Sequence, residues 1–393
     1  MDAYVIGAGP AGLATAAALR RRGVPAVVLE RESVVGASWR RHYDRLHLHT
    51  PRELSGLPGL PIPAEFGRWV ARDDVVRYLE LYAAHHRLEV HTGTPVARIE
   101  RGDRPGADPV ADGRPARWLV DLDGGESLPA DLVVVATGFN HTPVPPDFPG
   151  IGTFTGRVVR ACDFRSGEAH AGQDVLVVGT GNTGTEIAVD LAEHGARRVR
   201  LAVRTPPHIV RRDIGPWAAQ YTGILVRRLP VPLVDWAARA MARLSVPDLT
   251  AHGLGRPPEG MLTRVVRDNA IPVQDVGLIA AVQAGQVEPV AALQGFAGRD
   301  VLLADGTRIQ PGVVVVATGW RQGLKPIVGH LGVLDARGLP LSRGGRTPPG
   351  ADGLWFTGYT NPVSGMLREI AIDARRIARA AAGQRARQQQ RAG

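Results

Sequence analysis

Thiols and lysines are nearly absent from this chain of 393 residues. Cys162 is the single cysteine, which excludes an intramolecular disulfide and a redox pair of the C-x-x-C kind. Lys325 is the single lysine among 47 basic residues, and the formal net charge is +9. The arginines are scattered along the chain instead of forming one block, so we expect no nucleic acid as a partner.

Long hydrophobic runs are also missing. No uninterrupted apolar stretch reaches the length that spans a membrane, and no signal-peptide pattern precedes the first strand-like residues. The most apolar long segment, 217–244, contains charged residues at Arg227, Arg228, Asp235, Arg239 and Arg243. Such a segment is better interpreted as a helix that lines a pocket or lies on a surface. We expect a cytoplasmic protein without a transmembrane segment, and the oligomeric state stays open.

Metal-ligand patterns are absent as well. No pair of candidate histidines adjoins an acidic residue at helical ligand spacing, so no metal is expected. Three histidines remain candidates for a place near a ligand: His47, His49 and His208. Four aromatic residues fit either a substrate pocket or ordinary core packing: Trp217, Tyr221, Trp236 and Trp320.

Two glycine motifs of the spacing G-x-G-x-x-G stand out in what is present. The first consists of Gly7, Gly9 and Gly12, between a strand-like run at 4–6 and a helix-like run at 13–19. In this context the glycines allow a tight turn, a close approach of backbone to a pyrophosphate, and packing of helix on strand. The next strand ends at Glu30, an acid placed to accept hydrogen bonds from a ribose 2′-OH. The first motif therefore predicts FAD or NAD.

The second motif has the same context and a different strand end. It consists of Gly179, Gly181 and Gly184, after a strand-like run at 175–178. The following strand ends at Arg204, a cation where the first motif has an acid, and a cation suits a 2′-phosphate. The second motif therefore predicts NADPH.

A repeated apolar strand indicates how the two nucleotide-binding domains are arranged along the chain. The apolar run 132–135 leads into Ala-Thr-Gly at 136–138, and a near copy, 313–316, leads into Ala-Thr-Gly at 317–319. We predict an α/β fold with two Rossmann-like dinucleotide-binding domains, in which the NADPH domain is inserted into the FAD domain. The expected ranges are 1–165 and 306–383 for the FAD domain, 166–305 for the NADPH domain with a helical insertion at about 213–268, and 384–393 for a disordered tail.

Several segments resemble one family. Phe154, Gly156, Arg160 and Phe164 resemble the fingerprint of class B flavin-dependent monooxygenases, in which the Arg160 position is histidine. The segments 160–168, 43–46 and 271–277 are similar to the plant YUCCA branch of that family, and the resemblance covers the chain to about residue 383. A flavin-side Asn of many members has no match in 47–51, where Thr50 is the candidate for that place.

The resemblance implies FAD and NADPH as cofactors, with Arg212 as a second NADPH contact and Val96 as a backbone contact near the adenine. No catalytic side chain is assigned, because flavin and O2 carry the chemistry. The full set of cofactor-binding candidates is Gly7, Gly9, Pro10, Ala11, Gly12, Glu30, Arg31, Ser38, Trp39, Thr50, Val96, Thr137, Gly138, Gly179, Gly181, Asn182, Thr183, Gly184, Arg204, Arg212, Gly319 and Gly358.

The implied activity is oxygenation of a small organic substrate by a C4a-(hydro)peroxyflavin, with NADPH and O2 consumed. The YUCCA-like segments favour oxidative decarboxylation of an aryl 2-oxo acid such as indole-3-pyruvate. The alternatives are N- or S-oxygenation, a Baeyer-Villiger reaction, or an uncoupled NADPH oxidase or flavin reductase. A non-enzymatic nucleotide sensor or nucleic-acid binder is disfavoured by two complete cofactor motifs.

Overall fold

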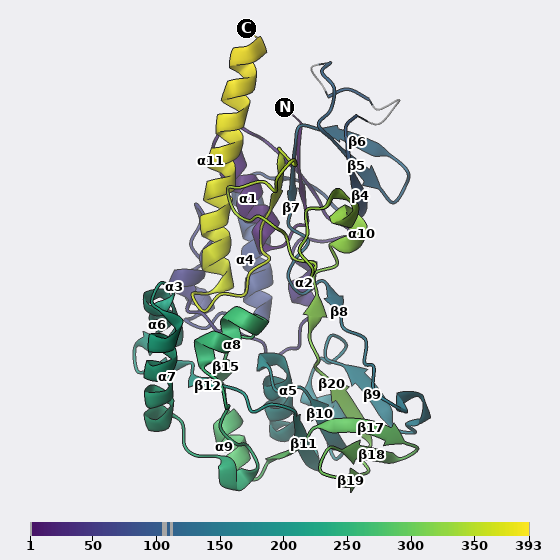
Figure 1. Ribbon diagram of the computed structural model, residues 1–393, viewed down its shortest axis with the longest axis vertical. Coiled ribbons are helices and arrows are strands. Elements are labelled where there is room, and N and C mark those ends of the chain that lie inside the picture. The colour runs from purple at the N-terminus through teal and green to yellow at the C-terminus, as the bar shows by residue number, and fades with distance from the viewer. Residues whose placement is uncertain (1, 104–107, 111–112, 393) are drawn as a thin grey trace.

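The chain folds around two parallel β-sheets, one in the upper and one in the lower part of the view in Figure 1. The computed structural model describes residues 2–103, 108–110 and 113–392. In spatial order the first sheet contains β22 (Leu354–Phe356), β7 (Leu132–Val135), β1 (Ala3–Ile6), β2 (Val27–Leu29) and β3 (Glu89–His91). Val5 pairs with Val28 on one side and with Val134 on the other. A central strand with two neighbours explains why β1 is apolar along its length.

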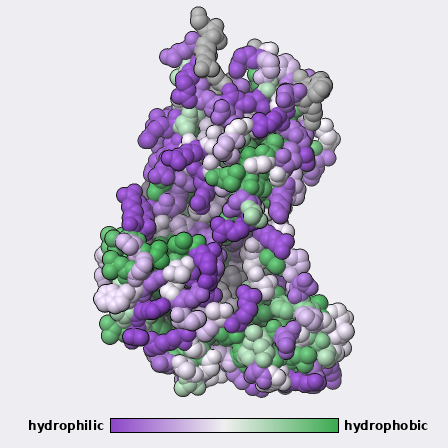
Figure 2. Space-filling model, viewed as in Figure 1, coloured by the Kyte–Doolittle hydropathy of each residue, from purple (hydrophilic) through white to green (hydrophobic). Residues whose placement is uncertain are grey.

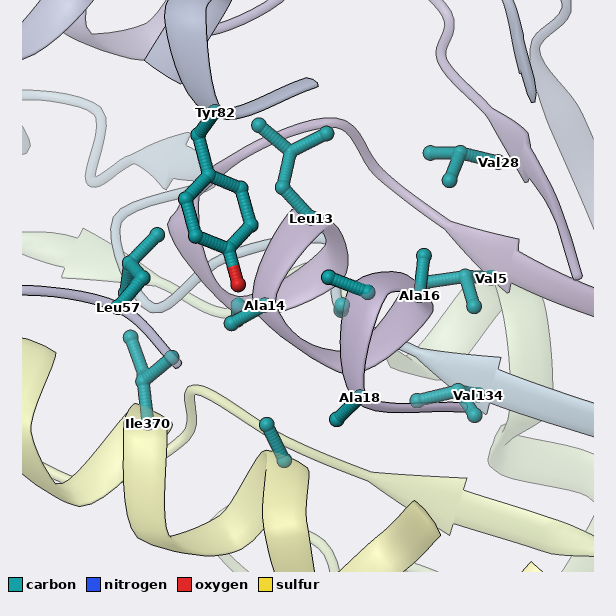
Figure 3. Close-up of a cluster of buried hydrophobic side chains, with 14 of the residues drawn as sticks. Val5, Leu13, Ala14, Ala16, Ala18, Val28, Leu57, Tyr82, Val134 and Ile370 are labelled. Carbon is teal, nitrogen blue, oxygen red and sulfur yellow. The ribbon is translucent and has the colours of Figure 1, made fainter. Parts of the chain in front are cut away.

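Three helices cover one face of the first sheet. They are α1 (Pro10–Arg20), α4 (Arg72–His85) and α11 (Met366–Ala392). Figure 3 shows α1 between the strands that carry Val5 and Val134 and the helix that carries Ile370. Alanines such as Ala14 and Ala18 on α1 let α11 approach closely, and the C-terminal helix thereby closes the first core.

The other face of the first sheet is covered by an antiparallel sheet. Its strands are β4 (Val96–Arg101), β5 (Trp118–Leu122) and β6 (Ser127–Ala130), with the short helix α10 (Lys325–Val328) beside them. Trp118 is 1% exposed and packs with Val133 and Phe356 in this layer. Both faces of β7 are therefore buried, as its unbroken apolar sequence predicts.

The second sheet is also parallel. In spatial order it contains β16 (Val287–Ala291), β11 (Arg198–Val203), β10 (Asp174–Val178), β20 (Val313–Val316) and β9 (Arg157–Arg160). The helices α5 (Asn182–Glu193) and α9 (Leu278–Gln283) contribute to the core on one face. The strands β17 (Leu293–Ala297), β18 (Asp300–Leu303) and β19 (Arg308–Ile309) form an antiparallel sheet that packs on the other.

A partly helical segment projects beside the second sheet. It contains α6 (Ala219–Val226), α7 (Val231–Ser245) and α8 (Met261–Asp268), with the paired strands β12 (Ile209–Arg211) and β15 (Val273–Asp275), and β13 (Asp213–Ile214) and β14 (Trp217–Ala218). The remaining elements are short: β8 (Thr142–Pro143), β21 (Trp320–Arg321), α2 (Ala37–Arg40), α3 (Arg52–Ser55), η1 (Ala64–Phe66), η2 (Ile151–Thr153), η3 (Gly167–His170), η4 (Thr250–His252) and η5 (Gly329–Leu331).

The FAD domain expected from the sequence covers residues 1–165 and 306–383, but two strands from these ranges lie in the second sheet. Both β9 and β20 belong to the second sheet, where Val315 pairs with Val177 on one side and with Val159 on the other. Sequence shows that β20 is a buried strand, but four consecutive valines suit either sheet equally well. The chain passes between the two sheets at β8 and β21, which pair with each other.

The expected disordered tail is wrong. Helix α11 continues past Gly383 to Ala392. Alanine, arginine and glutamine are strong helix formers, so a polar composition is compatible with helix here.

Candidate functional site

The first glycine motif joins β1 to α1. Gly7 has a φ of +106°, and a Cβ there would lie 2.6 Å from the carbonyl oxygen of Ala136. A Cβ on Gly12 would overlap the carbonyl oxygen of Gly7, whereas one on Gly9 would meet no atom within 4 Å. Gly7 and Gly12 are thus required by packing. Gly9 instead leaves open space at the N-terminus of α1, which is the kind of cradle that receives a phosphate.

Glu30 lies directly beside this motif. It is 8% exposed, and its carboxylate accepts hydrogen bonds from the backbone N–H of Ala8 at 2.6 Å and of Glu32 at 3.0 Å. The two donors fix the carboxylate at the carboxyl end of β2. The acid is therefore held in one orientation before any ligand arrives.

The second motif repeats the same construction between β10 and α5. Gly179 has a φ of +119°, and a Cβ there would overlap the carbonyl oxygen of Ala317. Gly184 is equally blocked, by the carbonyl oxygen of Gly179, while Gly181 has no atom within 4 Å of a Cβ position. Each Ala-Thr-Gly turn thus packs on one glycine motif, 136–138 on the first and 317–319 on the second.

The two arginines predicted for NADPH have different surroundings. Arg204 is exposed at the end of β11 and has no hydrogen-bond or ion-pair partner among the described residues. Arg212 is half-buried, and its guanidinium lies 4.4 Å from the ring centroid of Trp69. Burial lowers the pKa of Arg212. Arg204 is free to meet a phosphate, whereas Arg212 is already stacked on an aromatic ring.

One large cavity of about 1700 Å³ connects the two motifs, and Figure 2 shows the surface hollowed between the upper and lower parts of the molecule. Most of the predicted cofactor-binding residues line this cavity: Gly7, Gly9, Pro10, Ala11, Glu30, Arg31, Ser38, Trp39, Thr50, Val96, Thr137, Gly138, Gly181, Asn182, Thr183, Gly184, Gly319 and Gly358. Four do not contribute to its wall: Gly12, Gly179, Arg204 and Arg212. Common ligand pockets measure about 300–1,000 Å³, so this cavity has room for more than one ligand.

Tyr359 holds one of the Ala-Thr-Gly turns. Its hydroxyl accepts from the backbone N–H of Thr137 at 3.0 Å and lies 2.8 Å from the Thr137 hydroxyl. The ring is 1% exposed, and burial raises the pKa of the phenol. Sequence reasoning missed Tyr359, because nothing in the local pattern connects it to a turn so distant in the chain.

A buried polar cluster joins the two halves of the cavity. His49 Nε2 lies 2.8 Å from Glu186 Oε1, and Glu186 is 3% exposed on α5. Tyr43 is 2% exposed, and burial, together with the nearby Glu186 carboxylate, raises the pKa of its hydroxyl. The segment 43–49 thereby connects the first half of the molecule to the helix that begins at the second glycine motif.

A second set of contacts supports this junction. Arg45 pairs with Glu193 on α5 and donates to the carbonyl oxygen of Val276 at 2.8 Å. Asn182 accepts from the backbone N–H of Gln274 at 2.8 Å. The YUCCA-like segments 43–46 and 271–277 therefore meet at α5, a proximity that their positions in the sequence do not reveal.

The residues of the monooxygenase fingerprint are mainly structural. Phe154 packs on Phe296 with ring centroids 5.0 Å apart, and Phe164 is 1% exposed and stacks on His170. Arg160 lines the cavity, and its guanidinium donates to both carboxylate oxygens of Asp163 at 2.7 and 3.1 Å. The charge that replaces the fingerprint histidine is thus paired with a neighbouring acid.

The remaining candidates divide between cavity and surface. Trp217, Trp320, His49 and His208 line the cavity. Trp236 is 71% exposed, and Tyr221 donates to Glu53 at 2.9 Å outside the cavity wall. His47 is exposed and its Nδ1 lies 2.7 Å from the Arg45 carbonyl oxygen. Trp217 and Trp320 therefore line the cavity, whereas Trp236 and Tyr221 lie neither in its wall nor in the buried core.

Neither a metal cluster nor a membrane-crossing helix is found in the part of the chain that the structure describes. No group of three or more His, Cys, Asp or Glu side chains there is arranged to hold a metal ion. None of the helices there combines the length and the apolar character that crossing a bilayer requires.

The fold and the paired glycine motifs define a pyridine-nucleotide oxidoreductase. Residues 4–226 match the family described as pyridine nucleotide-disulphide oxidoreductase. The chain is 37% identical over 366 residues to indole-3-pyruvate monooxygenase YUCCA1 of Oryza sativa subsp. japonica, covering 91% of this chain and 86% of that protein. It is 33% identical over 380 residues to the probable indole-3-pyruvate monooxygenase YUCCA9 of Arabidopsis thaliana, covering 95% and 87%. The chain belongs to the flavin-dependent monooxygenase family that includes the YUCCA proteins, which confirms the resemblance stated from the sequence.

Solved structures share the fold. A flavin-containing monooxygenase from Stenotrophomonas maltophilia superposes with a TM-score of 0.70 at 24% identity, covering 98% of this chain and 97% of that one. OTEMO, in a complex with FAD and NADP, gives a TM-score of 0.71 at 18% identity, covering 96% and 83%. The family is FAD- and NADPH-dependent, and the chain is an oxidoreductase of that kind.

Proposed function

We propose that FAD lies against the first glycine motif and NADPH against the second, in two Rossmann-like domains of which the second is inserted into the first. The cavity of about 1700 Å³ that reaches both motifs carries this proposal. The open space at Gly9 and at Gly181 suits two pyrophosphates, because a side chain at either position would occupy it. The paired crossings at β8 and β21 support one insertion between two folding units.

The chain's own residues bind, orient and exclude water. Bound FAD supplies oxygen activation, and NADPH supplies the hydride that reduces it. Glu30, held by two backbone donors, is placed to orient a ribose 2′-OH. Thr137, fixed by Tyr359, shapes the wall beside the first motif. The apolar parts of the cavity wall keep water from the reacting atoms, which protects a coupled oxygenation from side reactions.

The substrate that the cavity supports best is an aryl 2-oxo acid such as indole-3-pyruvate, the substrate printed in the names of the plant relatives. Val234, Ala238 and Met241 of α7 line an apolar compartment for an aryl group. Arg239 lines the same cavity near His208, so a carboxylate would find a cation there. In this reaction one oxygen atom of O2 enters the new carboxylic acid and the other leaves as water. The original carboxyl leaves as CO2, and NADPH provides the two electrons.

The test measures what each NADPH produces. The FAD-loaded protein is mixed with NADPH, O2 and indole-3-pyruvate, and indole-3-acetate, CO2 and hydrogen peroxide are quantified. Catalase is present in a parallel reaction, because free peroxide decarboxylates 2-oxo acids without an enzyme. We expect one acid and one CO2 for each NADPH, unchanged by catalase. The substrate assignment fails if acid appears only without catalase.

An uncoupled NADPH oxidase is the second candidate. Arg160 occupies the position of the fingerprint histidine at the cavity wall. The observation that favours an oxidase is the bidentate contact of Arg160 with Asp163. The same experiment decides, because an oxidase releases one hydrogen peroxide for each NADPH whatever substrate is added. Product from an amine, a thioether or a ketone, with none from the 2-oxo acid, would instead identify the other oxygenation chemistries.

A further inference from the structure

An apolar face lies on the outside of α7, the turn before it and the end of α6. Its large side chains are exposed: Leu225 66%, Leu229 48%, Leu233 51%, Trp236 71% and Leu244 86%. Positions 233, 236, 240 and 244 share one side of the helix at helical spacing. Figure 2 shows hydrophobic residues gathered over α6, beside hydrophilic side chains. We call these five residues the α7 face.

This face is unusual because the same helix already contributes to the interior with its other side. Val234 is 4% exposed, and Val234 and Ala238 line the cavity. The outward residues are therefore not needed for folding α7 onto the protein. Contiguous exposed apolar residues of this size mark a surface that contacts another phase or molecule.

The exposed charges on α7 and in the turn before it are all positive. Arg228 and Arg243 are exposed and have no ion-pair or hydrogen-bond partner among the described residues. The acid in the same helix, Asp235, is turned inward, where it accepts from the backbone N–H of Leu262 at 2.6 Å and from the Thr263 hydroxyl at 2.6 Å. The apolar face is thus bordered by unpaired cations with no exposed acid in the same helix.

We propose that the α7 face docks on an anionic lipid surface, with α7 lying in the plane of the headgroups. Leucine and tryptophan on one side of a helix and arginine at its border are the pattern of helices that lie at a lipid interface. Anionic headgroups attract arginine near the surface. A second copy of this chain fits less well, because a two-fold contact would bring the same arginines against one another.

The position of the cavity gives this docking a consequence. Ile214, Trp217 and Met241 are 58%, 50% and 57% exposed, and all three also line the cavity. The cavity therefore opens beside the α7 face. A docked molecule holds this opening close to the lipid surface.

The test uses the FAD-loaded full chain and sedimentation with vesicles. One set contains phosphatidylcholine with phosphatidylglycerol, and the other contains phosphatidylcholine alone. The double variant Leu233→Glu/Leu244→Glu should lower the partition coefficient on the anionic vesicles about tenfold or more. The control Leu81→Glu/Leu341→Glu changes two leucines of similar exposure, 50% and 52%, elsewhere on the surface, and should bind as the wild type does. Flavin content verifies that each variant is folded.

A second variant isolates the charge. Arg228→Gln/Arg243→Gln should lower binding to the anionic vesicles about 25-fold, at roughly fivefold for each cation, and leave the weak binding to phosphatidylcholine unchanged. Absence of wild-type binding to anionic vesicles overturns the proposal, and so does equal binding to both vesicle types. A dimer in sedimentation velocity that Leu233→Glu/Leu244→Glu dissociates, without vesicle binding, would assign the face to a second copy instead.

Discussion

The two glycine motifs have the same backbone and different electrostatic surroundings. Gly7 and Gly179 both adopt positive φ, at +106° and +119°, against the carbonyl oxygen of an Ala-Thr-Gly turn. Beyond that point the sites diverge. Glu30 is buried and accepts two backbone hydrogen bonds, whereas Arg204 is exposed and has no partner within the described ranges.

The acid of the first site is preorganised, whereas the cation of the second site is not. The Glu30 carboxylate is already oriented, so a ligand there meets a group that loses little further freedom on binding. Arg204 must be ordered by its ligand, and the cost of that ordering reduces the affinity. A preorganised site suits a cofactor that stays bound, and a site that its ligand must order suits a cosubstrate that leaves after every turnover.

The largest effect is expected where the motifs are alike. Gly12→Ala and Gly184→Ala each place a Cβ on a backbone carbonyl that cannot move aside. Each should lower the free energy of unfolding by about 3 kcal/mol or more, measured by urea denaturation. We expect Gly12→Ala to lose its flavin absorbance. Gly184→Ala should remain yellow and lose its reduction by NADPH.

The matched controls are Gly9→Ala and Gly181→Ala. Both positions have φ near −80° and no atom near the new Cβ, so stability should change by less than about 1 kcal/mol. Nucleotide binding should still weaken, because the methyl group enters the cradle. If Gly184→Ala loses flavin together with Gly12→Ala, the two motifs belong to one cooperative unit and the contrast between them is not separable.

Much of this contrast could be predicted from the sequence. The glycine spacing, the acid at Glu30 and the cation at Arg204 depend on local order along a strand–turn–helix unit, which residue spacing encodes. The family was also identifiable, because its motifs are short and contiguous. The helices of the segment 213–268 followed from its apolar content and charge pattern.

The rest depends on contacts between distant segments. Four valines in β20 indicate burial, but only the three-dimensional register places them beside β10. The pairing of His49 with Glu186 and the contact of Tyr359 with Thr137 join residues that no periodicity relates. The helical tail shows a different limit, since its polar composition predicts disorder where helix propensity prevails.

A pH experiment tests the burial of His42, whose carbonyl oxygen accepts a hydrogen bond from Arg165 of the segment before the second glycine motif. Burial, together with the charges of Arg165 and Arg72, lowers the pKa of His42 from 6.5 to about 4. Between about pH 4 and pH 6.5, His42 is therefore protonated in the unfolded chain and neutral in the folded chain. The stabilisation by the neutral imidazole is complete above pH 6.5 and is lost as the pH falls to about 4.

The loss amounts to about 3 kcal/mol over that window. Because carboxylates titrate in the same range, the measurement is the difference between wild type and His42→Gln in urea unfolding, from neutral pH to about 4.5. We expect the variant to show a flatter pH dependence. Parallel curves for the two proteins would mean that His42 is protonated in the folded state.

The smallest effect is expected at the exposed cation, and it tests the contrast most directly. Arg204→Ala removes a charge-assisted contact to a 2′-phosphate, a loss of about 1.5–3 kcal/mol, or roughly tenfold to a hundredfold in affinity for NADPH. Affinity for NADH should change little, because that ribose has no phosphate for the arginine to meet. The control Arg197→Ala removes another exposed arginine near the start of the same strand and should leave both affinities unchanged. Flavin reduction rates titrated with each nucleotide give the affinities. An equal loss for NADPH and NADH would remove Arg204 from the phosphate site, and the cation at the end of β11 would then be an ordinary solvated strand end, unlike the fixed acid at Glu30.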